Sequence, residues 1–311
     1  MRVCVTGASG LIGRSVVRWL IQEPDITVSA VMRTLAASDV HENPTTERIS
    51  WIRADLGSYQ DCERIVDQHE VIIHLAHTNS PLTSDQDISS DTQLNLVPTL
   101  NLLSAVQRSG RCLHVIYPSS GGGIYGANTT GKPFREQDPC LPGSSYGIQK
   151  LAAEHYLRVY AERGYLTATV LRISNAYGWI HSPDRKQGLI GAALYQIRHN
   201  HPVRIIGSSA NVRDYVHILD IYQAIRRSLH RKSGFEVFNI GTGSGTSVDQ
   251  VIHTIEKVIG SSVARTIDRN INARFLSNWC VLDISQAREL LGWEPRIGIE
   301  EGIRTILQES Q

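Results

Sequence analysis

The chain has 311 residues, of which 41% are hydrophobic and 20% charged, a composition typical of a globular protein with one large core or two smaller ones. A formal net charge of +1 gives no electrostatic basis for binding nucleic acid or a membrane surface, and no apolar run approaches the length of a membrane span. Five cysteines show neither metal-ligand spacing nor a disulfide framework, so we expect a cytoplasmic protein that needs no metal.

The N-terminus has the pattern of a dinucleotide-binding turn. Residues 2–6 predict a short buried strand, an amphipathic helix continues through Leu20, and glycines stand between them at 7, 10 and 13. Two of these glycines permit a tight turn and close backbone approach, and the third lets the helix pack on the strand. The N–H groups at the start of the helix would face the phosphates. The predicted contacts are Gly7, Gly10, Leu11, Ile12 and Gly13.

Strands and helices alternate along the chain, which predicts a parallel sheet covered on both faces. The second strand is predicted over residues 27–32, and Arg33 follows it. In dinucleotide folds an acidic residue near this point binds the adenosine ribose, whereas an arginine accommodates a 2′-phosphate. We therefore expect NADP(H) to be preferred and NAD(H) to be possible; the other interpretation is that Arg33 opens a solvated loop.

Further strands are predicted over residues 49–52, 70–75 and 113–117, and a helix over residues 95–107, in which Pro98 must lie in the first turn or cause a kink. His74 and His77 are three residues apart in or after a strand, so we interpret them as packing and loop residues and not as metal ligands. The block of residues 118–126 follows a strand and lies where open α/β sheets bind ligands.

Tyr146 and Lys150 stand four residues apart at the start of a predicted helix, so they share one helical face. An ammonium near a phenol favours the phenolate, and we expect it to lower the pKa of Tyr146. Tyr146 is therefore a candidate general acid/base. The alternative is an exposed helix with two unrelated polar residues, because this spacing also arises by chance.

The later elements predict a second domain. They are a strand over residues 166–173, a turn at 175–178, a helix over 188–198, strands over 203–207 and 236–240, and a helix over 247–259 capped by Ser247. We expect a dinucleotide-binding domain of residues 1–173, to which residues 212–240 return. The substrate domain is expected over residues 174–311, assembled mainly from 174–211 and 241–311.

Taken together, the two motifs resemble the extended short-chain dehydrogenase/reductase family, the nucleotide-sugar epimerases, dehydratases and reductases. The resemblance runs over nearly the whole chain and includes the blocks at residues 55–56, 74–76, 119–126, 171–175, 213–217 and 291–295. It implies a doubly wound parallel sheet, Rossmann-like, with a smaller C-terminal α/β substrate domain. It also implies a nucleoside-diphosphate sugar as substrate and a homodimer formed through the helices that start near Asn95 and Tyr146.

The resemblance assigns further site residues. Those expected at the cofactor are Asp55, Leu56, Leu75, Ala76, Asn95, Ser119, Tyr146 and Lys150. Those expected at the substrate are Asn175, Arg213 and Arg274. Arg213 resembles a diphosphate clamp, which suits a guanidinium, unless it pairs with Asp214 or Asp220. Gly121 occupies the position that usually carries the catalytic Ser or Thr, so we assign that hydroxyl to Ser120, with Ser119 beside it.

The expected chemistry is hydride transfer at C4 of the sugar. Arg33 favours a reductase of a 4-keto-6-deoxysugar linked to dTDP, UDP or CDP, in deoxysugar or surface polysaccharide biosynthesis. The alternative is a UDP-hexose 4-epimerase of the UDP-glucose or UDP-GlcNAc type. A third interpretation, a non-catalytic NADP-binding regulator, is supported by Gly121 and opposed by intact Tyr146 and Lys150. A dehydratase is less favoured, because the block at residues 118–126 has no acidic pair.

Overall fold

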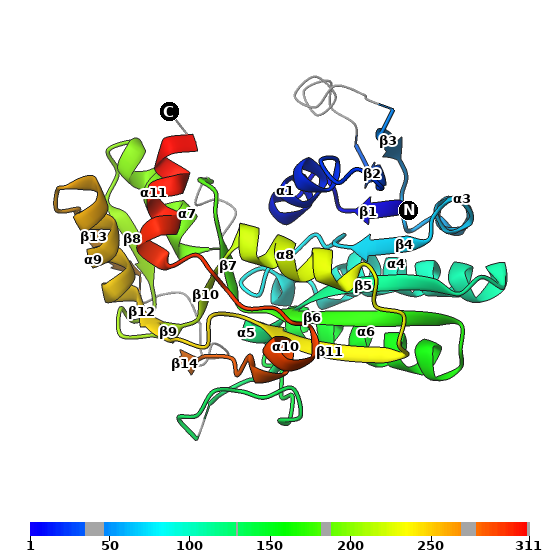
Figure 1. The fold of residues 1–311 in the computed structure, drawn as a ribbon. Helices are drawn as coiled ribbons and strands as arrows, with labels where there is room; N and C mark the ends of the chain where they lie inside the picture. Colours follow the sequence, from blue (N-terminus) through cyan, green and yellow to red (C-terminus); the bar gives the residue numbers. More distant parts are fainter. Residues whose placement is uncertain (35–46, 129, 182–187, 269–277, 310–311) are drawn as a thin grey trace.

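Seven parallel strands form the central sheet, in the order β11-β6-β5-β4-β1-β2-β3 (Figure 1). The computed structural model describes residues 1–34, 47–128, 130–181, 188–268 and 278–309. The strands of this sheet are β1 (Arg2–Thr6), β2 (Thr27–Met32), β3 (Ile49–Arg53), β4 (Val71–His74), β5 (Leu113–Ser120), β6 (Leu166–Ile173) and β11 (Phe235–Ile240). The strand order reverses direction between β1 and β4, as in doubly wound folds, and the predicted fold class is confirmed.

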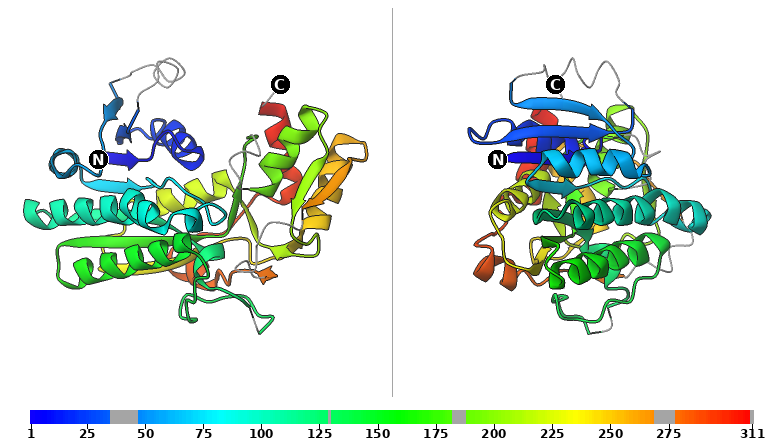
Figure 2. Two further views of the ribbon diagram at one scale, coloured as in Figure 1. Left: turned by 180° about the vertical axis from the view of Figure 1, so that it is seen from behind. Right: turned by 90° about the vertical axis from the view of Figure 1, so that its right-hand side faces the viewer.

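Helices cover both faces of this sheet (Figure 2). On one face lie α1 (Leu11–Leu20) and α8 (Ile218–Ser228), and on the other lie α3 (Tyr59–Gln68), α4 (Ile88–Ser109) and α6 (Ser145–Glu162). Successive residues of β1 alternate between two buried clusters: Val3 and Val5 join the side chains of α1 and α8, and Cys4 joins those of α3, α4 and α6. Burial on both faces explains the continuous apolar runs of the strands.

Strand β5 extends three residues beyond its predicted end at Tyr117. It pairs with β6 over its whole length, but with β4 only as far as Ile116. Pro118 therefore lies where one edge of the strand is free, and a missing N–H is tolerated there. The extension delivers Ser119 and Ser120 as the last residues of the strand.

Helix α4 begins at Ile88, well before the predicted start at Asn95. Asp87 is its N-cap and accepts a hydrogen bond from the Ser90 N–H, a cap that the prediction missed. Pro98 consequently lies inside the helix and not in its first turn, which excludes one of the two alternatives given for it.

A second group of elements lies to one side of the sheet (Figure 1). Its helices are α7 (Leu189–Arg198), α9 (Val248–Ile259) and α11 (Ile299–Glu309), which pack on the paired strands β8 (Val203–Ile206) and β13 (Arg265–Asp268). Ser247 caps α9 in a reciprocal capping box with Gln250, as its position in the sequence predicted. Two shorter helices, α5 (Gly121–Ile124) and α10 (Ser285–Leu290), and the 3₁₀ helix η1 (Ser84–Gln86) complete the helical elements of the described residues.

Short strands lie between the two groups. β7 (Asn175–Tyr177) pairs in parallel with β10 (Tyr215–His217), so the turn predicted at residues 175–178 is instead a strand. β9 (Val212–Arg213) lies between β12 (Thr246–Ser247) and β14 (Trp279–Cys280). Of the segment expected to return to the first domain, α8 and β11 lie with the large sheet, while β9 and β10 pair outside it. The two-domain division stays a prediction. Across the described ranges, no helix is long and apolar enough to cross a lipid bilayer.

Candidate active site

The glycine turn joins β1 to α1 and packs against the end of β4. Gly7 has a φ of +69°, and a Cβ on it would lie 2.7 Å from the Ala76 nitrogen. A Cβ on Gly13 would lie 2.3 Å from the Gly7 carbonyl oxygen. Both positions therefore require glycine, one for conformation and contact and the other for contact alone.

The first turn of α1 offers backbone N–H donors. Its N-cap is Gly10, which has no side chain with which to cap them, and the first turn carries no acidic residue. The first intrahelical hydrogen bond runs from the Arg14 N–H to the Gly10 carbonyl oxygen. The N–H groups of Leu11 and Ile12 come before it and therefore have no acceptor within the helix. Such a helix start fits the pyrophosphate of a dinucleotide.

Residues expected around the adenosine follow the neighbouring strands. Arg33 comes directly after β2 and is exposed. Asp55 follows β3, is also exposed, and accepts a hydrogen bond from the Gly57 N–H at 2.9 Å, while Leu56 is buried. Since parallel strands end at the same edge of the sheet, these residues lie on the same edge as the glycine turn.

Tyr146 and Lys150 lie in the first turns of α6, which Ser144 caps. The Lys150 side chain is only 5% exposed, and its Nζ donates to the Pro118 carbonyl oxygen at 3.0 Å. Nζ lies 4.7 Å from the ring centroid of Tyr117 and 5.9 Å from that of Tyr146. The two residues thus share a helical face beside the end of β5, as their spacing predicted.

Burial displaces the pKa of both side chains. It raises the pKa of Tyr146, and a hydrogen bond with Ser120 opposes that rise. Burial also lowers the pKa of Lys150 to about 8, opposed by the Glu154 carboxylate. The expectation that Lys150 lowers the pKa of Tyr146 was therefore wrong, because desolvation of the phenolate dominates. The phenol is protonated at neutral pH and can donate its proton.

The two serines at the end of β5 point in different directions. The Ser120 hydroxyl reaches Tyr146 and accepts from the Gly123 N–H at 3.1 Å. The Ser119 hydroxyl instead donates to the buried Glu154 carboxylate. Strand alternation produces this difference. The prediction that Ser119 contacts the cofactor gains no support from its hydroxyl, which is engaged inside the protein.

Gly121 has no room for the hydroxyl-bearing side chain that this position usually carries. A Cβ there would lie 2.5 Å from the Leu282 Cδ1 atom and 3.1 Å from the Arg172 carbonyl oxygen. A serine or threonine would therefore displace Leu282. Ser120 is the hydroxyl that this turn places beside Tyr146.

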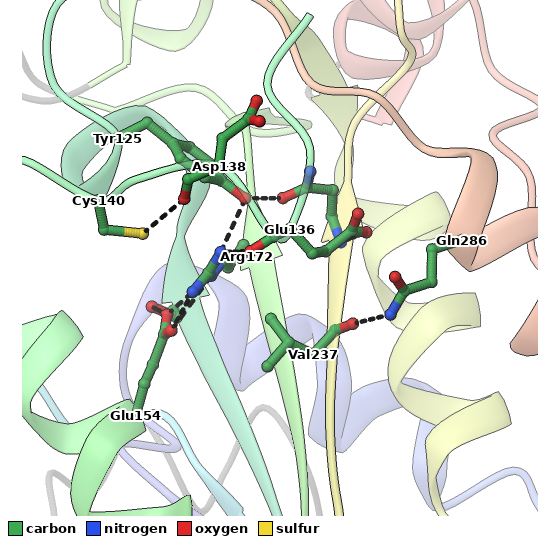
Figure 3. Close-up of polar contacts among 10 residues, drawn as sticks. Tyr125, Glu136, Asp138, Cys140, Glu154, Arg172, Val237 and Gln286 are labelled. Carbon is green, nitrogen blue, oxygen red and sulfur yellow. Dashed lines mark hydrogen bonds and ion pairs between the residues drawn. The ribbon is translucent and has the colours of Figure 1, made fainter.

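A buried ion pair, which was not predicted from the sequence, lies further along α6 (Figure 3). Arg172 of β6 donates to the Glu154 carboxylate at 2.8 Å, and the two side chains are 7% and 3% exposed. Arg172 also donates to the Tyr125 hydroxyl and to the Glu136 carbonyl oxygen, each at 2.9 Å. The Tyr125 hydroxyl in turn donates to the Asn239 Oδ1 atom at 2.7 Å. The network therefore joins α6, β6, β11 and the segment after β5.

The signal for this network was present in the sequence. Glu154 comes four residues after Lys150 and eight after Tyr146, so all three share one face of α6.

Asn95 holds a neighbouring segment and leaves no bond for a ligand. Its Oδ1 accepts from the N–H and the hydroxyl of Thr78, at 2.7 and 3.0 Å. Its Nδ2 donates to the backbone and the carboxylate oxygens of Asp91. These four bonds use the full capacity of the amide, so a direct contact of Asn95 with the cofactor is not supported. Asn95 positions the segment that follows β4.

On the substrate side, Asn175 lies near the turn that follows Ser120. A Cβ on Gly122 would lie 3.4 Å from the Asn175 Oδ1 atom. Arg274 lies outside the described residues.

Arg213 lies on β9 and is half-buried. Within the part of the chain that the structure describes, neither Asp214 nor Asp220 pairs with it. Asp214 accepts from Thr242, Gly243 and Leu282, and Asp220 accepts from the backbone N–H groups of residues 296 and 297. Burial without an acidic partner lowers the pKa of Arg213. Its Nη1 atom donates to the Val212 carbonyl oxygen at 2.8 Å. A role of Arg213 as a diphosphate clamp stays a prediction.

A sequence profile of the NAD dependent epimerase/dehydratase family matches residues 3–241. The chain belongs to this family. Among similar members, the dTDP-4-dehydro-6-deoxyglucose reductase of Escherichia coli is 31% identical over 319 residues, covering 98% of this chain and 96% of its own. The UDP-glucose 4-epimerase of Mycolicibacterium smegmatis is 30% identical over 307 residues, covering 97% and 96%.

Solved structures of the family agree. The UDP-glucose 4-epimerase of Thermotoga maritima, crystallised with UDP-glucose, has a TM-score of 0.89 and 30% identity, and the match covers 100% of this chain and 99% of that one. MoeE5 in complex with UDP-glucose and NAD has a TM-score of 0.88 and 27% identity, covering 100% and 98%. The chain is accordingly an NAD(P)-dependent enzyme related to nucleotide-sugar epimerases, reductases and dehydratases, and the interpretation as a non-catalytic regulator is set aside.

Proposed function

We propose that this enzyme reduces a 4-keto-6-deoxysugar carried on a nucleoside diphosphate (dTDP, UDP or CDP), with NADPH as the reductant. The observation that carries the proposal is the placement of the Tyr146 phenol beside the Ser120 hydroxyl and the buried Lys150 ammonium. Reduction of a ketone needs a proton donor at the carbonyl oxygen, and a phenol with a raised pKa is in the donating form. Similarity to the Escherichia coli reductase supports the same direction.

The glycine turn fits the cofactor. Gly7 and Gly13 allow the backbone to pack closely, and the first-turn N–H groups of α1 would hold the pyrophosphate. Lys150 would bind the nicotinamide ribose, and the exposed Arg33 would bind a 2′-phosphate, which favours NADPH. A bound nicotinamide supplies the hydride.

The chain's own residues then protonate and stabilise the sugar oxygen. Tyr146 donates its phenolic proton to that oxygen, and the Ser120 hydroxyl stabilises the negative charge that develops there. The Lys150 ammonium adds positive charge nearby, where low dielectric strengthens its effect. Arg213 would bind the diphosphate, and Asn175 would contact the sugar-nucleotide beside it.

A UDP-hexose 4-epimerase is the second candidate, because the Thermotoga maritima and Mycolicibacterium smegmatis relatives carry that activity in their names. It would use the same Tyr146, Lys150 and Ser120. The two reactions differ in outcome: the reductase consumes one cofactor for each turnover, whereas the epimerase consumes none.

Incubation with a panel of UDP-, dTDP- and CDP-sugars and their 4-keto forms, with NADPH or NADH, separates the candidates. The reductase predicts loss of nicotinamide absorbance in proportion to product, with one configuration at C4. The epimerase predicts both C4 epimers from a hexose substrate without net loss of absorbance. If no nucleotide sugar gives either result, both proposals are overturned.

We also propose a homodimer in the cytoplasm. The neighbouring helices α4 and α6 (Figure 2) expose Ile88 (59%), Leu94 (46%), Val97 (40%), Ile148 (55%) and Tyr156 (42%). A second copy would cover these side chains, and all five cysteines are free thiols, as a reducing compartment requires. Sedimentation should give twice the mass of the chain, and Leu94→Glu should halve it. A wild-type protein that sediments as a monomer would contradict the dimer.

A further inference from the structure

The imidazole of His77 lies against Tyr146 and has unused hydrogen-bonding capacity. The two ring centroids are 4.9 Å apart, and the ring planes cross at 86°. The His77 Nε2 atom is shielded from solvent and has no hydrogen-bond partner among the described residues. Buried polar atoms are nearly always bonded in folded proteins, so such an atom beside a reactive side chain requires an explanation.

His74, three residues earlier, shows how the fold treats a buried imidazole that has only a packing role. Its Nδ1 is hydrogen-bonded to the Thr6 hydroxyl at 2.8 Å, and its Nε2 to the Thr99 hydroxyl at 2.9 Å. Both residues were interpreted from the sequence as packing and loop residues. That interpretation is sufficient for His74, but it leaves the buried Nε2 atom of His77 unexplained.

The position of His77 is fixed by its neighbours. Thr78 is held by two hydrogen bonds to the Asn95 Oδ1 atom, and the Asn79 side chain donates to Asp91 at 2.6 Å. On its other side, Ala76 contacts the glycine turn so closely that Gly7 admits no Cβ. His77 is therefore held between the expected cofactor site and Tyr146, on an ordered segment.

The ring is uncharged at neutral pH. Burial, and then the positive charge of Lys150 and the nearby His74, hold the pKa of His77 well below its usual range. A neutral imidazole has one donor and one acceptor nitrogen. This combination suits a hydroxyl group, which both donates and accepts, better than it suits a phosphate or a carboxylate, for which a charged donor is stronger.

We propose that His77 binds a hydroxyl group of a sugar ring that lies beside Tyr146. The chemistry is the same whether the ring is the nicotinamide ribose or the hexose of the substrate, and the test below separates these sources. The inference rests on the proposed function only in that both ligands carry such a ring. His77 thereby becomes a ligand-binding residue of the site and adds a hydrogen bond that helps to orient the ring against Tyr146.

Binding measurements on His77→Phe test the proposal without turnover. Phenylalanine retains an aromatic ring against Tyr146 but removes both nitrogens. The probes are NADPH and, with NADP⁺ present, UDP-glucose and dTDP-glucose, each compared with its hexose-free diphosphate, UDP or dTDP. We expect a loss of about threefold to tenfold in affinity, the range for one neutral hydrogen bond. A loss confined to NADPH assigns the ribose, and a loss for the nucleotide sugars but not for UDP or dTDP assigns the hexose.

Three controls keep the result interpretable. His77→Asn can donate and accept, and it should retain affinity within about threefold of wild type. His114→Phe removes another buried imidazole, bonded to Thr167 near the start of β5, and should leave all affinities unchanged. In the unmutated protein, the imidazole nitrogen resonances of His77 should shift when the ligand binds.

Two results would overturn the proposal. One is affinity for every probe within twofold of wild type in His77→Phe, with unchanged nitrogen resonances in the wild type. The other is an equal loss for the nucleotide sugars and for UDP and dTDP, which would indicate a general distortion. Failure of the proposed reaction would appear differently, as absent turnover with binding intact.

Discussion

Helix α6 carries two sets of polar side chains on one face, and their hydrogen-bonding capacity is satisfied to different extents. At Glu154, the carboxylate accepts from Arg172 and from the Ser119 hydroxyl, inside a network that continues to β11 (Figure 3). One turn earlier, the Lys150 ammonium has a single carbonyl acceptor among the described residues. Tyr146, two turns before Glu154, has Ser120 and an edge contact with His77. The first group is internally satisfied, whereas the second has capacity left for a ligand.

This difference separates structural from functional polar residues more sharply than sequence spacing does. Tyr146, Lys150 and Glu154 follow each other at intervals of four, and the pattern does not distinguish them. Counting hydrogen-bond partners does, because a buried polar group that lacks partners is costly unless a ligand supplies them. The following substitutions test whether the two groups really have separate roles.

The largest expected effect is that of Tyr146→Phe on turnover. The substitution removes the proton donor and retains the ring, so kcat should fall by about a hundredfold to ten-thousandfold. The free energy of unfolding and the affinity for NADPH should stay near the wild-type values. Steady-state kinetics with calorimetry checks this, and turnover close to wild type would exclude Tyr146 as the acid.

Glu154→Gln should affect stability first. It leaves the Arg172 guanidinium buried without its countercharge, which typically costs about 3–5 kcal/mol of unfolding free energy. Glu162→Gln on the same helix is the matched control, because its partner Arg158 and Glu162 are 52% and 65% exposed, and such pairs contribute about 0–1 kcal/mol. Denaturant unfolding compares them, and equal losses would remove the distinction between buried and exposed pairs.

The same variant has a second readout in the pH dependence. The Glu154 carboxylate raises the pKa of Lys150, which burial lowers to about 8. Without the carboxylate, the ammonium is less favoured, so the pKa falls further. If protonated Lys150 is the active form, the alkaline fall in kcat/KM should lie near pH 8 in wild type and at lower pH in Glu154→Gln. A shift to higher pH would contradict the assignment.

The two serines at the end of β5 should affect different properties when they are replaced. Ser120→Ala should lower kcat by about tenfold to a thousandfold, through loss of a donor to the developing oxyanion. Ser119→Ala should instead cost about 1–3 kcal/mol of unfolding free energy, because it removes a hydrogen bond to a buried carboxylate. Measurements of kcat and of the unfolding free energy for both single mutants and the double mutant distinguish these two roles. Full activity in all three would show that the oxyanion is held elsewhere.

Arg33 tests the cofactor preference, with no change expected in the proton-transfer groups. NADPH should bind more tightly than NADH, and Arg33→Asp should narrow or reverse that preference by about 1.5–3 kcal/mol. Arg18→Asp makes the same change in net charge on the exposed side of α1 and should leave the preference intact. Titration of both cofactors against the three proteins measures it, and equal affinities in wild type would favour the epimerase.

Much of the fold was predictable because local patterns determine it. The glycine turn, the buried strands and the Ser247 cap depend on neighbouring residues, and the structure has them where the sequence predicted them. The start of α4 and strand β7 were missed. The first depends on a cap at Asp87 ahead of a polar stretch, and the second on pairing with β10, forty residues away in the chain.

In the candidate site, too, the local features could be predicted from the sequence and the long-range contacts could not. The spacing of Tyr146 and Lys150 was readable from one helix. The roles of Ser119, Asn95 and Glu154 were not, because each is set by a partner from another element: Glu154 for Ser119, Thr78 for Asn95 and Arg172 for Glu154. The direction of the Tyr146 pKa was also mistaken, since burial cannot be measured from spacing.

Transfer of deuterium from the cofactor to the sugar would demonstrate hydride transfer at C4. The enzyme is given NADPH that carries deuterium at both C4 positions, together with the 4-keto nucleotide sugar that the panel identifies. We expect one deuterium at C4 of the sugar for each NADPH consumed in wild type, and almost none in Tyr146→Phe over the same time. Oxidation of NADPH by the wild-type enzyme without deuterium at C4 would contradict hydride transfer at this carbon.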